Sequence, residues 1–257
     1  MKRVIFIGAG NLATNLSLEM RRQGFEILQI YSYTLQSAQL LAEQLGCCYT
    51  NKLKEIRRDA DLYVFSVKDA VLSSVLDQMP PNNGLWVHTA GSIPMSIFED
   101  YTNRYGVFYP LQTFSKNRHP DFSDIPFFIE ANTEADYDSL TSAASIMSRK
   151  VYSASSEQRK HLHLAAVFAC NFTNHMYAIA ARIVEEKGLP FDALKPLITE
   201  TATKIQSMAP LDAQTGPAIR YDENVINKHL SLLEDESLRS IYKELSRSIY
   251  NFSNNKK

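Results

Sequence analysis

A chain of 257 residues is long enough for one large domain or two modest ones. Hydrophobic residues make up 45% and charged residues 21%, which is typical of a protein with a buried core and a water-exposed surface. The net charge of −1 provides no overall field that favours nucleic acid or an anionic membrane, so neither is expected as a partner. Three cysteines without metal-site spacing predict no metal site and a reducing compartment, which favours a cytoplasmic location.

Neither a signal peptide nor a membrane span is expected. Lys2 and Arg3 are followed by only four apolar residues before the first glycine, which is too few for a signal peptide. The longest apolar region is interrupted by Asn171, Asn174 and His175, and a membrane-spanning helix of that length would rarely carry all three.

The first half of the chain alternates short apolar runs with helical patterns. Strands are predicted at 4–7, 26–31, 47–50, 61–67 and 85–89. Helices are predicted at 11–23, 35–45 and 70–78, followed by a helix near 135–147 between two edge strands at 127–130 and 151–152. Asp69 is placed to cap the third of these helices. This alternation predicts an α/β fold in which a doubly wound parallel sheet carries helices on both faces.

The second half of the chain has helical patterns only. The first begins at Ser155 or Ser156 and extends to Lys187, where Gly188 and Pro190 end it. Further helices are predicted at 192–208, 225–233 and 236–250. We therefore predict two domains, an α/β domain at residues 1–152 and an all-α C-terminal domain at residues 153–257.

The strongest local signal is a glycine-rich turn, Gly8-Ala9-Gly10-Asn11-Leu12-Ala13, between the first strand and the first helix. Gly8 permits the tight turn, Gly10 lets the backbone approach a pyrophosphate, and Ala13 allows close packing of the helix on the strand. The backbone N–H groups and the helix dipole then face the phosphate charge. We therefore predict a Rossmann dinucleotide-binding domain, with a ligand-free glycine turn as the alternative.

The end of the second strand bears on the choice of cofactor. Dinucleotide-binding domains specific for NAD usually place an acidic residue there, whereas this chain has Ser32, Tyr33 and Thr34. Ser32 and Thr34 can donate to a 2′-phosphate, and Tyr33 can stack on adenine. NADP is therefore the predicted cofactor, and NAD remains possible because the arginine expected beside a 2′-phosphate is also missing.

Loops after the fourth and fifth predicted strands should flank the dinucleotide, because ligands of open α/β sheets bind at the carboxyl ends of the strands. Ordinary loops with capping residues are an equally good reading for any single position. The residues assigned to cofactor contacts in these loops are Val67, Lys68, His88, Ala90 and Gly91, and Ser92 is assigned to the substrate.

Polar residues on the long predicted helix form a candidate catalytic stripe. At about 100° per residue, His163, Asn171 and Asn174 fall within about 60° of Lys160 around the helix axis. Hydride transfer to a carbonyl or imine needs a proton donor, and Lys160 or His163 can act as that general acid. Asn171 can orient the reacting group. A solvated helix face with a structural histidine is the alternative.

A second dense motif runs from Gln214 to Asp222, where Gly-Pro demands a turn. Arg220 can hold a substrate anion or pair with Asp222. From the residues alone, a structured loop between helices is the simpler interpretation.

Several motifs taken together resemble a family of bacterial Rossmann-like NADP oxidoreductases whose helical C-terminal domain has no known function. These are the glycine turn and the segments His88–Ser92, Tyr109–Phe114 and Thr215–Asp222. The layout is also distantly similar to pyrroline-5-carboxylate reductase, the deazaflavin-dependent NADP reductases, ketopantoate reductase and the 3-hydroxyacid dehydrogenases. The resemblance implies a helical domain like the C-terminal domain of 6-phosphogluconate dehydrogenase, which often dimerises, so a homodimer is expected.

The resemblance also bears on single residues. In the hydroxyacid branch a catalytic lysine and asparagine lie four residues apart, whereas here Leu164 follows Lys160 at that distance and Asn171 is only an analogue. The residues that the motifs assign to the substrate, besides Ser92, are Gln112, Thr113, Thr215, Gly216, Arg220 and Asp222.

The predicted function is hydride transfer between NADP(H) and a small polar metabolite, a carbonyl or imine compound or a hydroxy acid, in a cleft between the two domains. The main alternative is a non-catalytic protein that senses the dinucleotide or serves as a scaffold. A third possibility is a transferase or lyase that uses the nucleotide site for another ligand.

Overall fold

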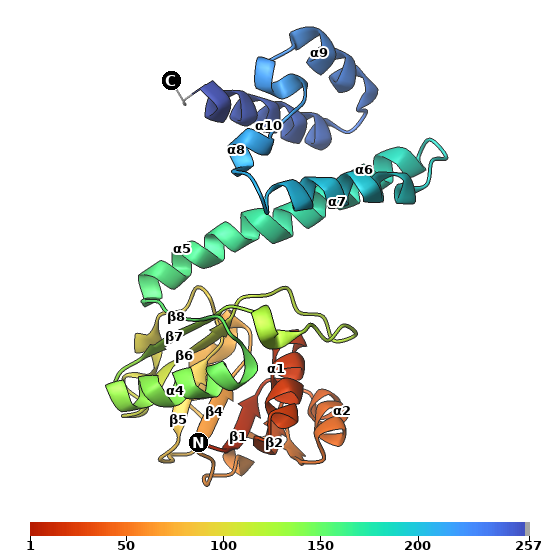
Figure 1. The fold of residues 1–257 in the computed structure, drawn as a ribbon. Coiled ribbons are helices and arrows are strands. Elements are labelled where there is room, and N and C mark those ends of the chain that lie inside the picture. The colour runs from red at the N-terminus through yellow and green to blue at the C-terminus, as the bar shows by residue number, and fades with distance from the viewer. Residues whose placement is uncertain (255–257) are drawn as a thin grey trace. The chain divides into compact units, whose positions relative to one another are not determined.

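The computed structural model describes residues 1–254. They form two compact units, which divide between Asn174 and His175. The first unit contains one eight-stranded sheet with the order β3-β2-β1-β4-β5-β6-β7-β8 (Figure 1). Its strands are β1 (Arg3–Ile7), β2 (Glu26–Tyr31), β3 (Cys48–Thr50), β4 (Leu62–Phe65), β5 (Leu85–His88), β6 (Tyr105–Pro110), β7 (Phe127–Ala131) and β8 (Val151–Ser153).

Helices link these strands in the order that the sequence predicts. The helices of the first unit are α1 (Asn11–Arg22), α2 (Leu35–Leu45), α3 (Leu72–Leu76), α4 (Glu134–Met147) and α5 (Ser156–Ala166). Neighbouring strands run parallel except β6 and β7, which are antiparallel. The structure therefore confirms the predicted doubly wound α/β fold, with a sheet that is mostly parallel.

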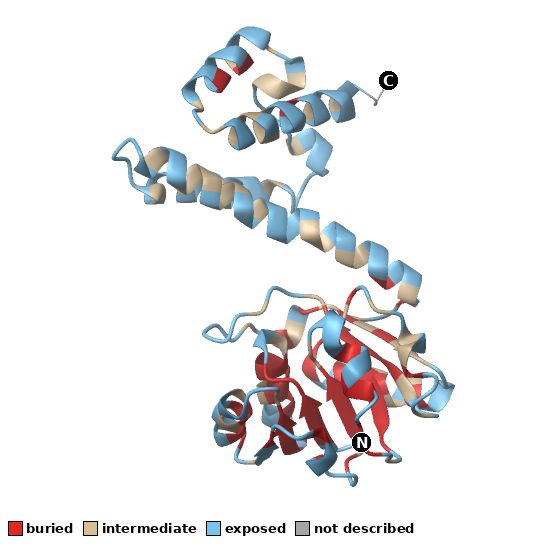
Figure 2. Cartoon of the chain, turned by 180° about the vertical axis from the view of Figure 1, so that it is seen from behind, coloured by how far each residue is buried: buried red, intermediate tan, exposed pale blue. Residues whose placement is uncertain are grey.

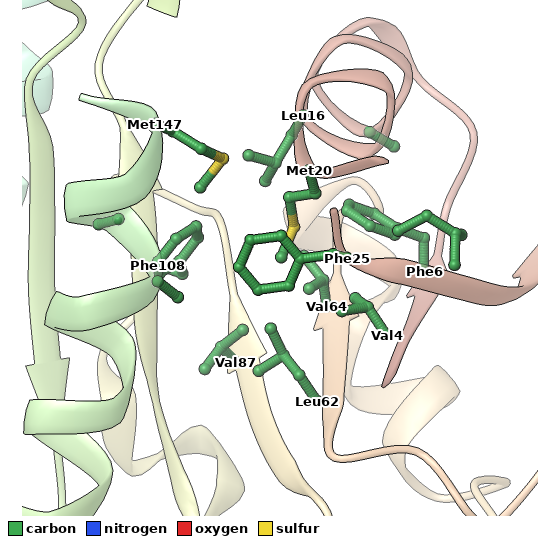
Figure 3. Close-up of a cluster of buried hydrophobic side chains, with 14 of the residues drawn as sticks. Val4, Phe6, Leu16, Met20, Phe25, Leu62, Val64, Val87, Phe108 and Met147 are labelled. Carbon is green, nitrogen blue, oxygen red and sulfur yellow. The ribbon is translucent and has the colours of Figure 1, made fainter. Parts of the chain in front are cut away.

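Two buried clusters cover the two faces of this sheet. One cluster packs α1, α2 and α4 against the strands through side chains such as Leu16, Met20 and Met147 (Figure 3). The other joins α3 to the opposite face through Leu72, Val75 and their neighbours. Every residue of β4 and β5 is buried, as expected for central parallel strands that have helices on both faces (Figure 2).

Four details of the first unit differ from the expectations. The strand β6 was not predicted, and it separates β5 from β7, so β7 is an inner strand and only β8 lies at the edge. The predicted helix at 70–78 is only α3, preceded by a short 3-10 turn, Asp69–Val71. Asp69 caps neither element, because its carboxylate accepts a hydrogen bond from the Ser92 hydroxyl.

The long helix begins as predicted, with a capping box formed by Ser155 and Gln158. It is not uniformly α-helical, because Val167–Phe172 forms a π-helical turn between α5 and α6 (Thr173–Glu185). A π turn inserts one extra residue and rotates the following residues by about 100° around the axis. The single stripe from Lys160 to Asn174, which assumed an unbroken α-helix, is therefore wrong beyond the π turn.

The second unit is helical throughout its described part. Its elements after α6 are α7 (Lys195–Lys204), α8 (Pro210–Ala213), α9 (Glu223–Leu232) and α10 (Glu236–Asn254), together with 3-10 turns at Phe191–Leu194 and Pro217–Arg220. The described residues contain no helix that is long and apolar enough to cross a membrane. Residues 154 and 155 link β8 to α5, so the predicted domain boundary at 152 lies near the end of the sheet, whereas the compact units divide at Asn174.

Candidate functional site

The turn between β1 and α1 is shaped by its two glycines. Gly8 has a φ of 123°, and a Cβ on it would lie 2.2 Å from the backbone oxygen of Ser66 at the end of β4. A Cβ on Gly10 would meet nothing within 4 Å, so the space beside this exposed residue is open. Gly8 thus allows the turn to pass close to the backbone at the end of β4, whereas Gly10 leaves room for a ligand.

The first turn of α1 is prepared for an anion. Gly10 is its N-cap residue, no side chain caps the helix, and no acidic residue lies in the first turn. The N–H groups of Asn11 and Leu12 therefore belong to an uncapped helix start that carries partial positive charge. Together with the open space at Gly10, this chemistry fits the pyrophosphate of a dinucleotide.

The end of β2 carries the predicted ribose contacts. Ser32 is half-buried, with its N–H bonded to the backbone oxygen of Thr50. Thr34 donates its hydroxyl hydrogen to Ser37 at 2.7 Å, and Tyr33 is 89% exposed. Hydroxyl groups and an exposed aromatic ring are therefore present at this end, and no carboxylate lies between Tyr31 and Leu35.

The loops after β4 and β5 lie against the glycine turn. The Thr89 hydroxyl donates to the Ser66 hydroxyl at 3.2 Å, which joins the two loops. Val67 packs against the buried cluster that joins α3 to the sheet, while Lys68 is exposed. The structure therefore brings the predicted Val67, Lys68 and Ala90 to the same sheet edge as the glycine turn.

The side chain of His88, another predicted cofactor contact, points into the protein. It is completely buried, and its Nδ1 accepts a hydrogen bond from the backbone N–H of Ala90 at 3.2 Å. Burial and the nearby charge of Arg159 lower the pKa of His88 to about 3. His88 therefore stays neutral at ordinary pH and supports the loop from below.

The buried His88 should make stability depend on pH. Unfolded histidine takes up a proton near pH 6.5, whereas His88 in the folded protein resists protonation down to about pH 3. The unfolded chain then binds more protons, so the free energy of unfolding falls as pH drops through this range, by up to about 1.4 kcal/mol per pH unit.

Denaturant unfolding between pH 7 and 4 measures this effect. We expect His88→Gln, which keeps an acceptor for the Ala90 N–H, to show a shallower loss of stability with falling pH than the wild type. The exposed His161 provides the control, and His161→Gln should keep the wild-type slope. Equal slopes for His88→Gln and the wild type would contradict the prediction.

A histidine and a tyrosine meet above the β5 loop. The Tyr109 hydroxyl, at the carboxyl end of β6, lies 3.0 Å from Nδ1 of His163 on α5. A Cβ on Gly91 would lie 2.5 Å from the His163 ring, so glycine allows the ring to approach the loop. Burial raises the pKa of Tyr109 to about 12, which keeps its hydroxyl protonated. The predicted Gly91 and His163 are therefore neighbours, and Tyr109 joins them.

The other predicted residues of the first unit are more exposed. Lys160 and Asn171 are exposed on the long helix, on either side of the start of the π turn. Ser92 bonds to Asp69, and Gln112 and Thr113 lie in the exposed loop after β6, where the Gln112 side chain accepts from the Thr113 N–H.

The predicted motif of the second unit forms a tight turn. Gly216 has a φ of 101° and Tyr221 a φ of 51°, and the 3-10 turn Pro217–Arg220 lies between them. Asp222 caps α9 by accepting from the Val225 N–H, and in the described structure it forms no ion pair with Arg220. Arg220 and Thr215 are exposed.

Sequence reasoning missed a buried arginine. The side chain of Arg159 is 1% exposed and forms an ion pair with Glu130 of β7. Arg159 comes one residue before Lys160 on a helix that begins with polar residues. Nothing in this local sequence distinguishes it from a solvent-exposed arginine. Only the pairing of β7 with the rest of the sheet reveals a half-buried carboxylate beside it.

Taken together, fold and site define a Rossmann dinucleotide-binding protein with an additional helical unit. Residues 3–87 match the family described as NADP oxidoreductase coenzyme F420-dependent, and residues 125–249 match a domain of unknown function, DUF2520. No curated protein sequence matches the chain.

Solved structures agree with these matches. A “putative NADP oxidoreductase” from Bacteroides fragilis is 52% identical, with a TM-score of 0.92 over 97% of this chain and 98% of that one. The chain belongs to this family of NADP oxidoreductases, which confirms the resemblance seen in the sequence.

More distant structures share the fold. The 1-pyrroline-5-carboxylate reductase of Streptococcus pyogenes is 12% identical, with a TM-score of 0.65 over 97% of this chain and 98% of that one. An imine reductase from Myxococcus stipitatus in complex with NADP+ is 16% identical, with a TM-score of 0.64 over 98% of this chain and 93% of that one.

Proposed function

We propose that the protein transfers hydride between NADP(H) and the carbon of a C=N or C=O bond in a small polar metabolite. The observation that carries this proposal is the contact of His163 with Tyr109 and Gly91 at the carboxyl ends of the strands, where the dinucleotide is proposed to bind. The structural likeness to reductases of pyrroline carboxylate and imines favours C=N among the possible bonds.

The chain's own residues would hold the dinucleotide along the carboxyl edge of the sheet. The backbone from Gly8 to Leu12 would bind the pyrophosphate. The Ser32 hydroxyl would donate to the 2′-phosphate of NADP, and the Thr34 hydroxyl would do so after turning away from Ser37. Val67, Lys68, Ala90 and Gly91 line the other end through the loops after β4 and β5. NADPH, when bound, supplies the hydride.

His163 would supply the proton. In its protonated form the imidazole donates Nδ1–H to the oxygen of Tyr109 and keeps Nε2–H for the substrate nitrogen or oxygen. Because burial keeps Tyr109 an uncharged hydroxyl, this residue orients the ring and does not compete for the proton. Loss of the Nε2 proton leaves a neutral ring still bonded to Tyr109 and ready to be reprotonated from solvent.

Other predicted residues keep supporting roles in the proposal. Lys160, one turn before His163, is exposed and can attract an anionic substrate or replace His163 as the acid. Asn171 can orient the reacting group. Ser92, Gln112 and Thr113 are candidate substrate contacts at the ends of β5 and β6. In the second unit, Thr215, Gly216, Arg220 and Asp222 remain candidates for binding an anionic group.

Ligand-dependent thermal unfolding tests the nucleotide part of this proposal. NADPH should raise the melting temperature more than NADH at the same concentration, because the Ser32 and Thr34 hydroxyls can donate to a 2′-phosphate and no carboxylate is present there to accept from a 2′-hydroxyl. A screen of cyclic imines and 2-oxo acids, followed by NADPH absorbance, would then identify the substrate class. No stabilisation by either nucleotide would contradict the proposal.

We also propose a homodimer formed through the helical residues. Within the described residues of the second unit, the buried hydrophobic side chains are Ile226 and Leu230, and neither α6 nor α7 buries a residue. On the preceding part of the long helix, Leu164, Phe168 and Phe172 are exposed. Apolar surface of this extent is usually covered by a partner protein, and a second copy of this chain is the simplest such partner.

Sedimentation velocity measures the oligomeric state. The wild type should sediment as a dimer, and Phe168→Glu should shift it toward monomer, because the 63% exposed ring would be replaced by a charge within the interface. Leu40→Glu, at a 55% exposed position on α2, is the control and should leave the dimer intact. A monomeric wild type would contradict the proposal. The three free cysteines support a cytoplasmic location for this dimer.

A further inference from the structure

The buried Arg159 joins its own helix to two other segments of the first unit. Its guanidinium forms an ion pair with Glu130 of β7 through Nη1 at 2.5 Å. Nε donates to the backbone oxygen of Ala90 at 3.2 Å, and Nη2 donates to the backbone oxygen of Ile93 at 2.5 Å. A single side chain thus joins helix α5, strand β7 and the loop after β5.

The Ala90 peptide groups are held from both sides by buried side chains. The N–H of Ala90 donates to His88, and its C=O accepts from Arg159. Few positions in a loop have both backbone groups bonded to completely buried side chains, and a backbone held in this way has little freedom to rotate. These two hydrogen bonds therefore fix the conformation of the loop beside the proposed nicotinamide end.

Glu130 and Ser156 hold Arg159 in turn. The Glu130 carboxylate accepts from the backbone N–H of Ser156 at 2.9 Å and from its hydroxyl at 2.8 Å. The Ser156 hydroxyl also accepts from the backbone N–H of Met95, at the far end of the same loop, at 2.9 Å. The start of α5 and both ends of the loop are thereby attached to one carboxylate.

This attachment also sets the position of His163, one helical turn beyond Arg159. The His163 ring lies over Gly91, inside the segment whose ends Arg159 grips at Ala90 and Ile93. A shift of α5 along its axis would therefore move the proton donor and the loop together.

We propose that Arg159 is a positioning residue that holds the Ala90–Ile93 loop in the conformation that binds the nicotinamide end of NADP(H), in register with His163. The proposal rests on the proposed function, because it assigns this loop to that cofactor. If Arg159 only stabilised the fold, its ion pair with Glu130 would be enough. The two hydrogen bonds to the backbone oxygens of Ala90 and Ile93 act on the loop alone.

The substitution Arg159→Lys separates these two roles. A lysine ammonium can still pair with Glu130, but it lacks the planar fork that reaches both Ala90 and Ile93. We expect the Kd for NADPH, measured by fluorescence titration of the full-length protein, to rise about tenfold because binding must first order the loop. Hydrogen exchange at the amides of residues 90–93 should also become faster.

Arg104 provides a matched control at the opposite edge of the sheet. It pairs with the buried carboxylate of Asp136 at 2.6 Å and donates to the backbone oxygen of Asn83 at 3.3 Å, so its bonding resembles that of Arg159. It precedes β6, whereas the nucleotide would bind at the carboxyl ends of the strands. Arg104→Lys should lower the melting temperature without changing the Kd for NADPH or the exchange at residues 90–93.

The outcomes distinguish this inference from the proposed function. Wild-type affinity and exchange in Arg159→Lys would overturn the inference and leave the NADP function standing. Equal weakening of NADPH binding by Arg104→Lys would also overturn it, since a general loss of stability would then explain both. Failure of the wild type to bind NADPH would overturn the proposed function itself.

Should Arg159→Lys not fold, Glu130→Gln serves as the second variant. It keeps the shape of the side chain and the oxygen that accepts from the Ser156 N–H, but an uncharged NH2 group replaces the oxygen that pairs with Arg159. We expect it to raise the Kd for NADPH and to speed exchange at residues 90–93. An unchanged Kd and unchanged exchange would overturn the inference.

Discussion

Alanine in place of His163 should lower turnover with NADPH at least about 100-fold, because a positioned general acid contributes about 10²–10⁴-fold to such reactions. The loss should appear in kcat, since His163 bonds to Tyr109 and is proposed to act on the substrate proton. The Kd for NADPH should change little, because the glycine turn and the β2 end, which are proposed to bind most of the cofactor, do not contact this ring. Steady-state kinetics on the imine or carbonyl substrate found in the screen measures both quantities.

Two further variants sharpen this result. His161→Ala, two residues earlier on the same helix with a 70% exposed side chain, should keep wild-type turnover. Tyr109→Phe removes only the hydroxyl that orients the ring, so it should reduce kcat less than His163→Ala does. If His163→Ala retained full turnover, the proton would have to come from another group, and Lys160 would be the next candidate.

Alanine in place of Gly8 should destabilise the protein by about 4 kcal/mol, which combines backbone strain at positive φ with a clash in a packed core. The structural reasons are the φ of 123° and the 2.2 Å separation that a Cβ would have from the backbone oxygen of Ser66. Backbone that directly follows a central strand cannot move aside as a flexible side chain can. Denaturant unfolding measures the change in the free energy of unfolding.

Gly10→Ala is the matched comparison for Gly8→Ala. Its Cβ would meet no protein atom within 4 Å and its φ is −78°, so the free energy of unfolding should change by less than about 1 kcal/mol. The methyl group would occupy the space through which the backbone approaches a pyrophosphate, so the Kd for NADPH should rise at least about tenfold. Tight NADPH binding by Gly10→Ala would place the pyrophosphate elsewhere.

Local sequence was enough to predict the elements whose signals are contiguous. Residues 26–31 and 35–45 were predicted as strand and helix with the bounds that the structure shows, and the glycine turn was placed correctly between β1 and α1. Periodicity, the Gly46 C-cap and the two glycines of the turn are properties of short segments, so they can be read without knowing the rest of the fold.

Strand β6 could not be predicted in the same way. Its residues, YGVFYP, contain a glycine and end in proline, and nothing local shows that they fill the space between β5 and β7. Gly106 lies there because a Cβ would be 2.4 Å from the backbone oxygen of Glu130 on β7. That requirement exists only once the two strands are paired.

The sequence by itself determined the class of protein, because a strand, a glycine turn and a helix in direct succession already contain the chemistry of a dinucleotide site. The tertiary structure alone decided which polar residues act together. It buried Arg159 against Glu130, brought Tyr109 to His163, and broke the predicted stripe with a π turn. Each of these depends on contacts between segments far apart in the chain, whose energies come from burial and pairing that no local pattern records.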